Sequence, residues 1–240
     1  MSSDVRPPPP VHYGVLVFPG FQALDMFGPL DLLNMLSLSQ PMQLSVIAAT
    51  LAPVSTQVTG PMNAPGSAFA QTIFPTHTCA APPAELEVLL VPGGFGAMGE
   101  LPEEVRFVKA VYPRLRYLVS VCNGASVLAR AGVLDGRRAT TNKAYWTEAT
   151  GPGPNVQWVP IARWVVDGNI WTASGVSAGL DAMAAFIGLS SHALLFAWLL
   201  THRQPCSTAR KWQMIYATSS SMNATRTRPG TRSRLSTRSL

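Results

Sequence analysis

The chain has 240 residues, of which 47% are hydrophobic and 12% are charged, a composition that excludes an intrinsically disordered chain. The net charge is +6, but residues 182–240 hold 8 basic residues and no acidic one, whereas residues 1–181 contain 10 basic and 12 acidic residues. The basic balance therefore belongs to the end of the chain, and we expect no nucleic-acid binding by its body. Three cysteines without close spacing are typical of a reducing compartment, so we expect a cytoplasmic protein without disulfide bonds.

Apolar strands alternate with helices along most of the chain. β-Branched runs predict strands at 13–18, 44–49, 86–91, 117–121 and 156–159, and a hairpin over 164–172. Helices are predicted from about Asp25 or Gly28 to residue 36, over 101–112, from the turn at Cys122, and from Gly175. Residues 53–75 are punctuated by Pro, Thr and Gly and predict short hairpin strands or an excursion from the sheet. This alternation predicts an α/β fold, a three-layer sandwich around a mostly parallel sheet.

Three predicted strands end in residues that suit a ligand site. The pairs Pro19-Gly20 and Gly93-Gly94 each follow a strand, and Cys122 follows another. Ligands of open α/β sheets bind outside the carboxyl ends of the strands. One crevice is therefore expected to contain all three strand ends.

Cys122 is the strongest candidate for a catalytic residue. It lies between the apolar run 117–121 and a helical pattern of small residues, so its thiol is expected in a sharp strand-to-helix turn. The N–H groups and dipole of a helix N-terminus favour negative charge, which predicts a stabilised thiolate and a nucleophile. The alternative is a small buried cysteine with a packing role.

Asp25 is the candidate acid or base. It is predicted near the start of the first helix, just before Gly28-Pro29, where a carboxylate could cap the helix or exchange protons with a substrate. By itself the residue favours the cap, whereas a position opposite Cys122 favours catalysis.

Five motifs in the order of one family carry a resemblance. They are Phe18-Pro-Gly-Phe-Gln-Ala-Leu-Asp25-Met-Phe-Gly28-Pro29, Leu89-Leu-Val-Pro-Gly-Gly94, Val121-Cys122-Asn123-Gly124-Ala125, Ala139-Thr-Thr and Ala173-Ser-Gly-Val-Ser-Ala-Gly179. Over residues 11–188 the chain resembles the ThiJ/PfpI family of the class I glutamine-amidotransferase-like superfamily. The resemblance implies a flavodoxin-like sandwich. The Asp-x-x-Gly-Pro element is most similar to the isonitrile hydratase branch of that family.

The resemblance implies hydration of an isonitrile, R–N≡C, to an N-substituted formamide without a metal or an organic cofactor. In this interpretation Cys122 adds to the isonitrile carbon, and Asp25 holds a water molecule and shuttles protons. Backbone N–H groups near Gly94 and Asn123 steady developing negative charge. The expected partner is a small-molecule substrate, and a homodimer is possible. Phe21, Phe27 and Trp146 either line the crevice or belong to the core.

Two positions depart from the family pattern and leave alternatives open. Protease-like and glyoxalase-like members place His after the cysteine, where this chain has Asn123. The hydratase branch usually has Thr there and His after the paired threonines, where this chain has Asn142. Another activity of the family, glyoxalase-like or amidase-like, is one alternative, and a non-catalytic redox- or ligand-sensing module is the other.

Two further motif matches are interpreted as structural. Gly94-x-Gly96-x-x-Gly99 fits a dinucleotide loop, but no acidic residue follows at the end of the next strand. Gly175-x-Ser177-x-Gly179 fits a hydrolase elbow, but too little chain remains for a hydrolase sheet. No spacing of His, Cys and Asp suggests a metal site.

The composition predicts three regions. Residues 1–10 form a disordered Pro-rich leader without a signal peptide, 11–188 the α/β domain, and 189–240 an atypical basic tail. The codons of residues 223–234, read one nucleotide earlier, permit the acidic, Asp-Pro-containing ending typical of the family. We interpret the tail as a frameshift or a missed splice boundary, and expect a membrane contact only if the tail is genuine.

Overall fold

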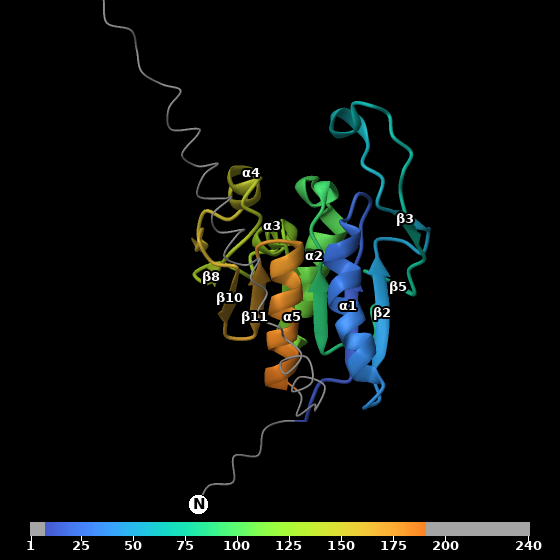
Figure 1. Cartoon of the computed structure of the whole chain (residues 1–240), viewed down its shortest axis with the longest axis vertical. Helices are drawn as coiled ribbons and strands as arrows, with labels where there is room; N and C mark the ends of the chain where they lie inside the picture. Colours follow the sequence, from blue (N-terminus) through green and yellow to red (C-terminus); the bar gives the residue numbers. More distant parts are fainter. Residues whose placement is uncertain (1–7, 191–240) are drawn as a thin grey trace, which may run out of the picture. The chain divides into compact units, whose positions relative to one another are not determined.

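A computed structural model of the chain describes residues 8–190. Their centre is a seven-stranded sheet in the order β10-β11-β7-β6-β1-β2-β5 (Figure 1). Its strands are β1 (His12–Leu16), β2 (Gln43–Ala48), β5 (His77–Thr78), β6 (Val88–Val91), β7 (Tyr117–Val121), β10 (Trp164–Asp167) and β11 (Ile170–Ala173). Within this seven-stranded sheet, only the β10–β11 hairpin pairs antiparallel. The mostly parallel, flavodoxin-like sheet predicted from the sequence is confirmed.

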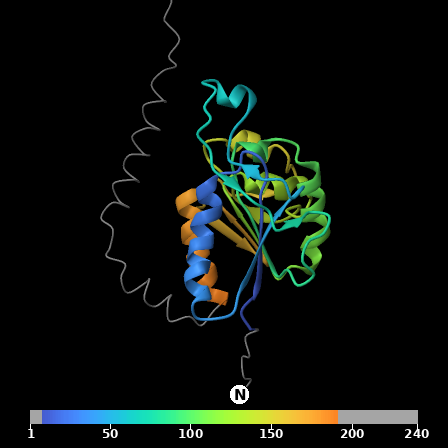
Figure 2. The same cartoon turned by 90° about the vertical axis from the view of Figure 1, so that its right-hand side faces the viewer.

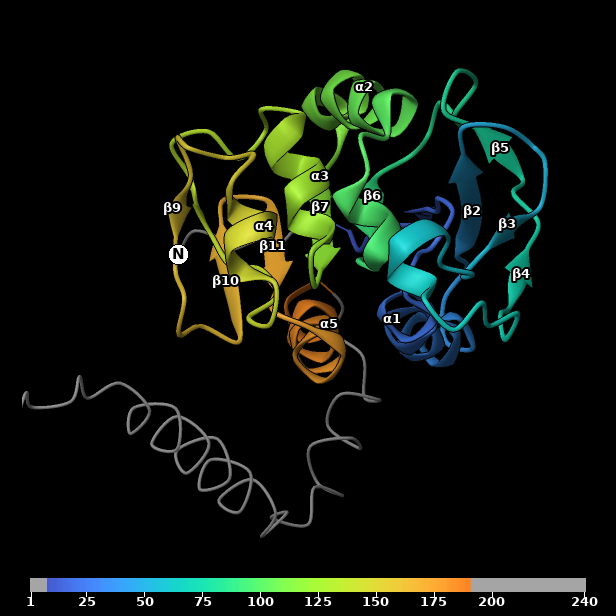
Figure 3. The same cartoon turned by 90° about the horizontal axis from the view of Figure 1, so that it is seen from above.

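Helices cover both faces of the sheet. They are α1 (Ala23–Ser37), α2 (Pro102–Val111), α3 (Gly124–Arg130), α4 (Trp146–Thr150) and α5 (Val176–Ser190). α1 and α5 lie together on one face, and α2 and α3 lie on the other (Figures 2 and 3). A side chain at Gly28 would collide with Leu180 of α5, so this glycine lets the two helices approach closely.

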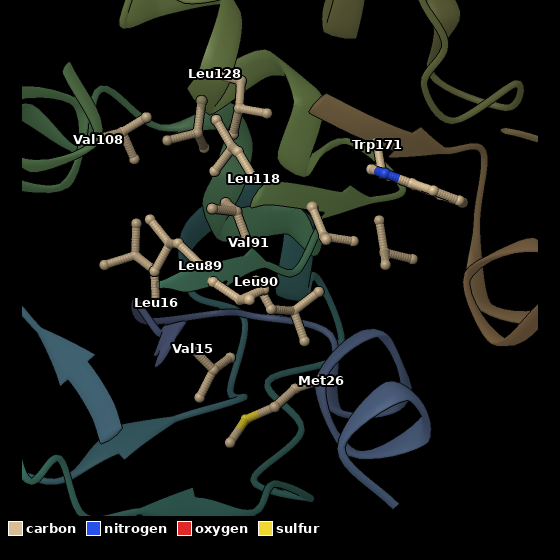
Figure 4. Packing of buried hydrophobic residues seen from close by; sticks show 14 of the residues in the cluster. Val15, Leu16, Met26, Leu89, Leu90, Val91, Val108, Leu118, Leu128 and Trp171 are labelled. Atoms are coloured by element: carbon tan, nitrogen blue, oxygen red, sulfur yellow. The ribbon is translucent and has the colours of Figure 1, made fainter. Parts of the chain in front are cut away.

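The core fills the space between the sheet and these helices. Central strands contribute Val15, Leu16, Leu89 and Leu118, and these side chains are buried (Figure 4). The helices contribute residues such as Met26 of α1, Val108 of α2 and Leu128 of α3. The strands buried on both faces explain the continuous apolar runs of the sequence.

Smaller elements surround the main sheet. β3 (Val54–Ser55) pairs with β4 (Thr72–Ile73), and this confirms short hairpin strands within residues 53–75. β8 (Arg138–Ala139) pairs with β9 (Gln157–Trp158) outside the main sheet. Single-turn 3₁₀ helices occur at Gly60–Asn63, Phe95–Met98 and Tyr112–Arg114.

The start of α1 differs from the prediction, and most of the predicted tail lies outside the described residues. The first helix begins at Ala23, earlier than predicted, and Pro29 lies inside it. Proline was a misleading start signal, because its fixed φ suits a helix and its missing N–H removes only one hydrogen bond. The expected frameshifted tail, apart from the end of α5, lies outside the described residues. Within residues 8–190, no helix is long and apolar enough to cross a membrane.

Candidate active site

The loops that follow β1, β6 and β7 meet at one edge of the sheet. Gly94 and Cys122 line a common pocket there as predicted, whereas Pro19 and Gly20 do not line it. Gly96 N–H donates to the Gly20 carbonyl oxygen over 3.1 Å, and Gln22 N–H donates to the Gly93 carbonyl oxygen over 2.7 Å. A side chain at Gly94 would collide with the backbone of Gly20. Gly94 and Gly96 of the dinucleotide-like motif therefore serve this close packing of two loops.

Cys122 lies in the turn between β7 and α3 with a φ of 58°, in the left-handed region that residues other than glycine seldom adopt. Its N–H donates to the Ala173 carbonyl oxygen over 2.9 Å, which continues the β7–β11 pairing into the turn. Gly93 makes room for it, since a Cβ there would lie 2.6 Å from Cys122 Cβ. The predicted strand-to-helix elbow is therefore present.

Asp25 lies beside the cysteine, in the first turn of α1, and is completely buried. Its Oδ2 accepts a hydrogen bond from Gly93 N–H over 3.1 Å. Its Oδ1 accepts no hydrogen bond of ordinary geometry from the described residues. The N-cap of α1 is Gln22, so the capping role considered for Asp25 is wrong.

Both groups hold a proton more tightly than they would in water, and the thiol holds it more tightly than the carboxyl group. Burial raises the pKa of Asp25 to about 6, although the Gly93 N–H and the Cys122 thiol both oppose this. Burial and, after it, the negative charge of Asp25 together raise the pKa of Cys122 to about 12. The expectation of a stabilised thiolate is therefore wrong, because burial and the carboxylate outweigh the helix terminus. At neutral pH the site holds a thiol beside a carboxylate that can accept its proton.

Asn123 and Gly94 interact with each other. Asn123 is 3% exposed, and its Oδ1 accepts a hydrogen bond from Gly94 N–H over 2.8 Å. The Gly94 N–H is thus already engaged, whereas the Asn123 N–H approaches the sulfur and lowers the pKa of the thiol. Of the two predicted N–H groups, only that of Asn123 faces the sulfur directly.

Asn142 is a site residue that the sequence reasoning did not select. Its Nδ2 donates to Cys122 Sγ over 2.9 Å, and this contact lowers the thiol pKa. The preceding Thr141 donates its hydroxyl to the Cys122 carbonyl oxygen over 3.0 Å. The signal was present, because Asn142 follows the paired threonines and stands where the hydratase branch usually has His.

A pocket of about 280 Å³ opens above the sulfur. Phe95 and Tyr145 form part of its wall, with ring centroids 5.5 Å apart in an edge-to-face arrangement. The other lining residues are Gln22, Gly94, Cys122, Asn123, Asn142, Gly175 and Val176. Of the aromatic residues considered for the crevice, Phe21 is buried and Trp146 packs against Trp158. Among the residues that the structure describes, no charged side chain lines the pocket.

The fold and the site together define a flavodoxin-like protein with a cysteine elbow beside a buried carboxyl group. The profile of the DJ-1/PfpI family matches residues 14–188, and the chain belongs to that family.

The proteins to which the chain is similar carry the names of more than one kind of enzyme. The chain is similar to an isonitrile hydratase of Pseudomonas putida, with 37% identity over 172 residues that cover 70% of this chain and 67% of the relative. It is 35% identical over 115 residues to a deglycase of Pyrococcus horikoshii, covering 45% of this chain and 64% of the relative. A ThiJ/PfpI family protein from Pseudomonas syringae has a similar structure, with a TM-score of 0.64, 26% identity and coverage of 85% of this chain and 83% of that one.

Proposed function

We propose that this protein hydrates an isonitrile to an N-substituted formamide, with Cys122 as nucleophile and Asp25 as the acid and base. The observation that carries the proposal is the pairing of Cys122, which lines a pocket without charged side chains, with the buried Asp25 carboxyl group beside it. Similarity to an isonitrile hydratase over two thirds of both chains supports the reaction type.

The first half of the reaction forms a thioimidate. Asp25 accepts the Cys122 proton as the sulfur bonds to the terminal carbon of R–N≡C, and the same proton then passes from Asp25 to that carbon. The product is R–N=CH–S–Cys122, and Asp25 is again a carboxylate. The raised pKa of Asp25, about 6, suits a group that both takes and returns a proton near neutral pH.

The second half consumes water. Asp25 removes a proton from a water molecule that attacks the thioimidate carbon, and this proton goes to the nitrogen. The tetrahedral R–NH–CH(OH)–S–Cys122 then loses its hydroxyl proton and expels the sulfur, which is reprotonated. The formamide R–NH–CHO leaves, so the sum is one isonitrile plus one water. The Asn123 N–H and the Asn142 amide assist by donating to the departing sulfur.

The pocket supports a small, uncharged substrate. Its volume of about 280 Å³ lies near the lower end of the usual range for ligand sites. The edge-to-face pair of Phe95 and Tyr145 provides an apolar wall that suits an aryl or bulky alkyl group.

A deglycase-like or glyoxalase-like activity is the second candidate, because of the 35% identity to the deglycase. Asn123 opposes it, since glyoxalase-like members place a histidine at this position and an amide cannot take a proton. The raised thiol pKa opposes a redox sensor, because the thiolate is the form that oxidants attack.

Formamide formation from an aryl isonitrile, followed by mass spectrometry, tests the proposal. The wild-type protein is compared with Cys122→Ala and Asp25→Ala, each checked for folding by thermal unfolding. We expect product from the wild type alone, with ¹⁸O from labelled water in the formyl oxygen. No product from folded wild-type protein over a panel of aryl and alkyl isonitriles would reject the proposal.

A further inference from the structure

The orientation of the Asn142 amide is set by the backbone that follows it. Its Oδ1 accepts hydrogen bonds from the N–H groups of Ala144 and Tyr145 over 2.8 and 3.0 Å. Two backbone donors at one amide atom identify that atom as the oxygen. The NH₂ group is therefore the end that faces Cys122 Sγ, at 2.9 Å.

The oxygen of the Asn123 amide is also held by a backbone donor, the Gly94 N–H at 2.8 Å, and this residue lines the same pocket as Asn142. The Asn123 Nδ2 donates no hydrogen bond within the described part of the chain, although the residue is only 3% exposed. This nitrogen is not among the buried polar atoms that lack a partner, so it keeps access to the pocket, where a bound molecule can accept its hydrogen bond.

We propose that the NH₂ groups of Asn123 and Asn142 form a donor site that selects substrates by a head group that accepts hydrogen bonds. The Asn142 oxygen accepts two backbone N–H groups and the Asn123 oxygen accepts one, so both amides are held with their NH₂ ends free to donate to a ligand. Naming isonitriles as its natural ligands rests on the proposed function. The terminal carbon of an isonitrile carries a lone pair and no hydrogen, so it matches this site.

An anionic ligand is disfavoured at this site, because the Asp25 carboxylate lies beside the sulfur.

Binding of two unreactive ligands of nearly equal shape tests the proposal. Benzonitrile ends in a hydrogen-bond acceptor, whereas phenylacetylene ends in a C–H group. Dissociation constants are measured at pH 8 by ligand-observed NMR in the Cys122→Ala variant, which lacks the nucleophile. We expect benzonitrile to bind about tenfold more tightly than phenylacetylene, as one or two hydrogen bonds provide.

Aspartate substitutions in this background sharpen the test. Asn142→Asp and Asn123→Asp each keep an oxygen for the backbone donors but replace the NH₂ group by an acceptor. Each is expected to remove most of the tenfold preference. Gln22→Glu is the matched control: it adds a negative charge to the same pocket without altering either amide, so the preference should remain.

Equal affinity for the two ligands, or binding of neither, would overturn the proposal, as would a preference that survives both aspartate substitutions. Loss of the preference in Gln22→Glu would also overturn it, since charge alone would then explain the result. The experiment does not depend on turnover. If no formamide forms but the nitrile preference holds, the proposed function fails while the donor site stands.

Discussion

The two sides of the Cys122 sulfur differ in what they offer a proton. On one side the buried carboxylate of Asp25 accepts hydrogen bonds, and its charge raises the thiol pKa. On the other side the Asn123 N–H and the Asn142 amide donate, and both lower it. In the proposed reaction this difference lets one sulfur be a thiol at rest and a leaving group later. The proton would move on the Asp25 side, and the amides would stabilise the thiolate when it forms.

Removing the Asp25 carboxylate, the acceptor of the thiol proton in the proposed reaction, is expected to have the largest effect on activity. In Asp25→Asn, the thiol loses the group that takes its proton, so kcat/KM for formamide formation should fall by about 10²–10⁴-fold. Steady-state kinetics with an aryl isonitrile measure this change. A fall of less than threefold would mean that another group accepts the proton.

Filling the space that Gly93 leaves beside Cys122 and Asn123 is expected to have the next largest effect on stability and activity. In Gly93→Ala, the new Cβ would lie 2.5 Å from Asn123 Oδ1 and 2.6 Å from Cys122 Cβ. The backbone must shift, so chemical denaturation should show a loss of about 1–3 kcal/mol together with a loss of activity.

Gly175→Ala is the control for this substitution, since Gly175 also lines the pocket but has open space around its Cβ position. Its stability should change by less than about 0.5 kcal/mol. A stable and fully active Gly93→Ala variant would contradict the packing described for the elbow.

Asp25→Asn is also expected to change the free energy of unfolding, and this effect is smaller. The pKa of Asp25 is raised from 3.8 to about 6 in the folded protein, so the folded state holds this proton more tightly than the unfolded state. The stability linked to it is present below about pH 4 and is lost as the pH rises through 6. Asp25→Asn should therefore stabilise the protein at pH 7.5 by roughly 1–3 kcal/mol, and by much less at pH 4. Thermal unfolding at both pH values measures the difference. Destabilisation at pH 7.5 would contradict the conclusion that burial disfavours the ionised form of Asp25.

The sequence predicted the parts of the site that depend on local structure. The strand 117–121 matches β7, because a β-branched run followed by small residues defines a strand and a turn within ten positions. The convergence of Gly20, Gly94 and Cys122 followed from the parallel order of the strands. The family motifs placed Asp25 near the cysteine, although its position inside α1 excludes the capping role that its neighbours suggested.

The parts that were missed depend on tertiary contacts. Asn142 lies 20 residues from Cys122 along the chain, and its contact exists only because the loop after β8 folds back over the elbow. The expectation of a stabilised Cys122 thiolate was wrong for a related reason. Burial of Cys122 and the approach of Asp25 are set by packing between elements, whereas the helix terminus is visible in the local pattern.

The pH dependence of kcat/KM for formamide formation tests the central claim, that ionised Asp25 takes the proton of a neutral Cys122 thiol. With the uncatalysed rate subtracted, kcat/KM should rise about tenfold per pH unit up to an inflection near the Asp25 pKa of about 6 and stay level to pH 8. Asp25→Asn should lack that inflection. A wild-type kcat/KM that shows no change near pH 6 and keeps rising through pH 8 would contradict the account, because the reaction would then depend on a thiolate formed without Asp25.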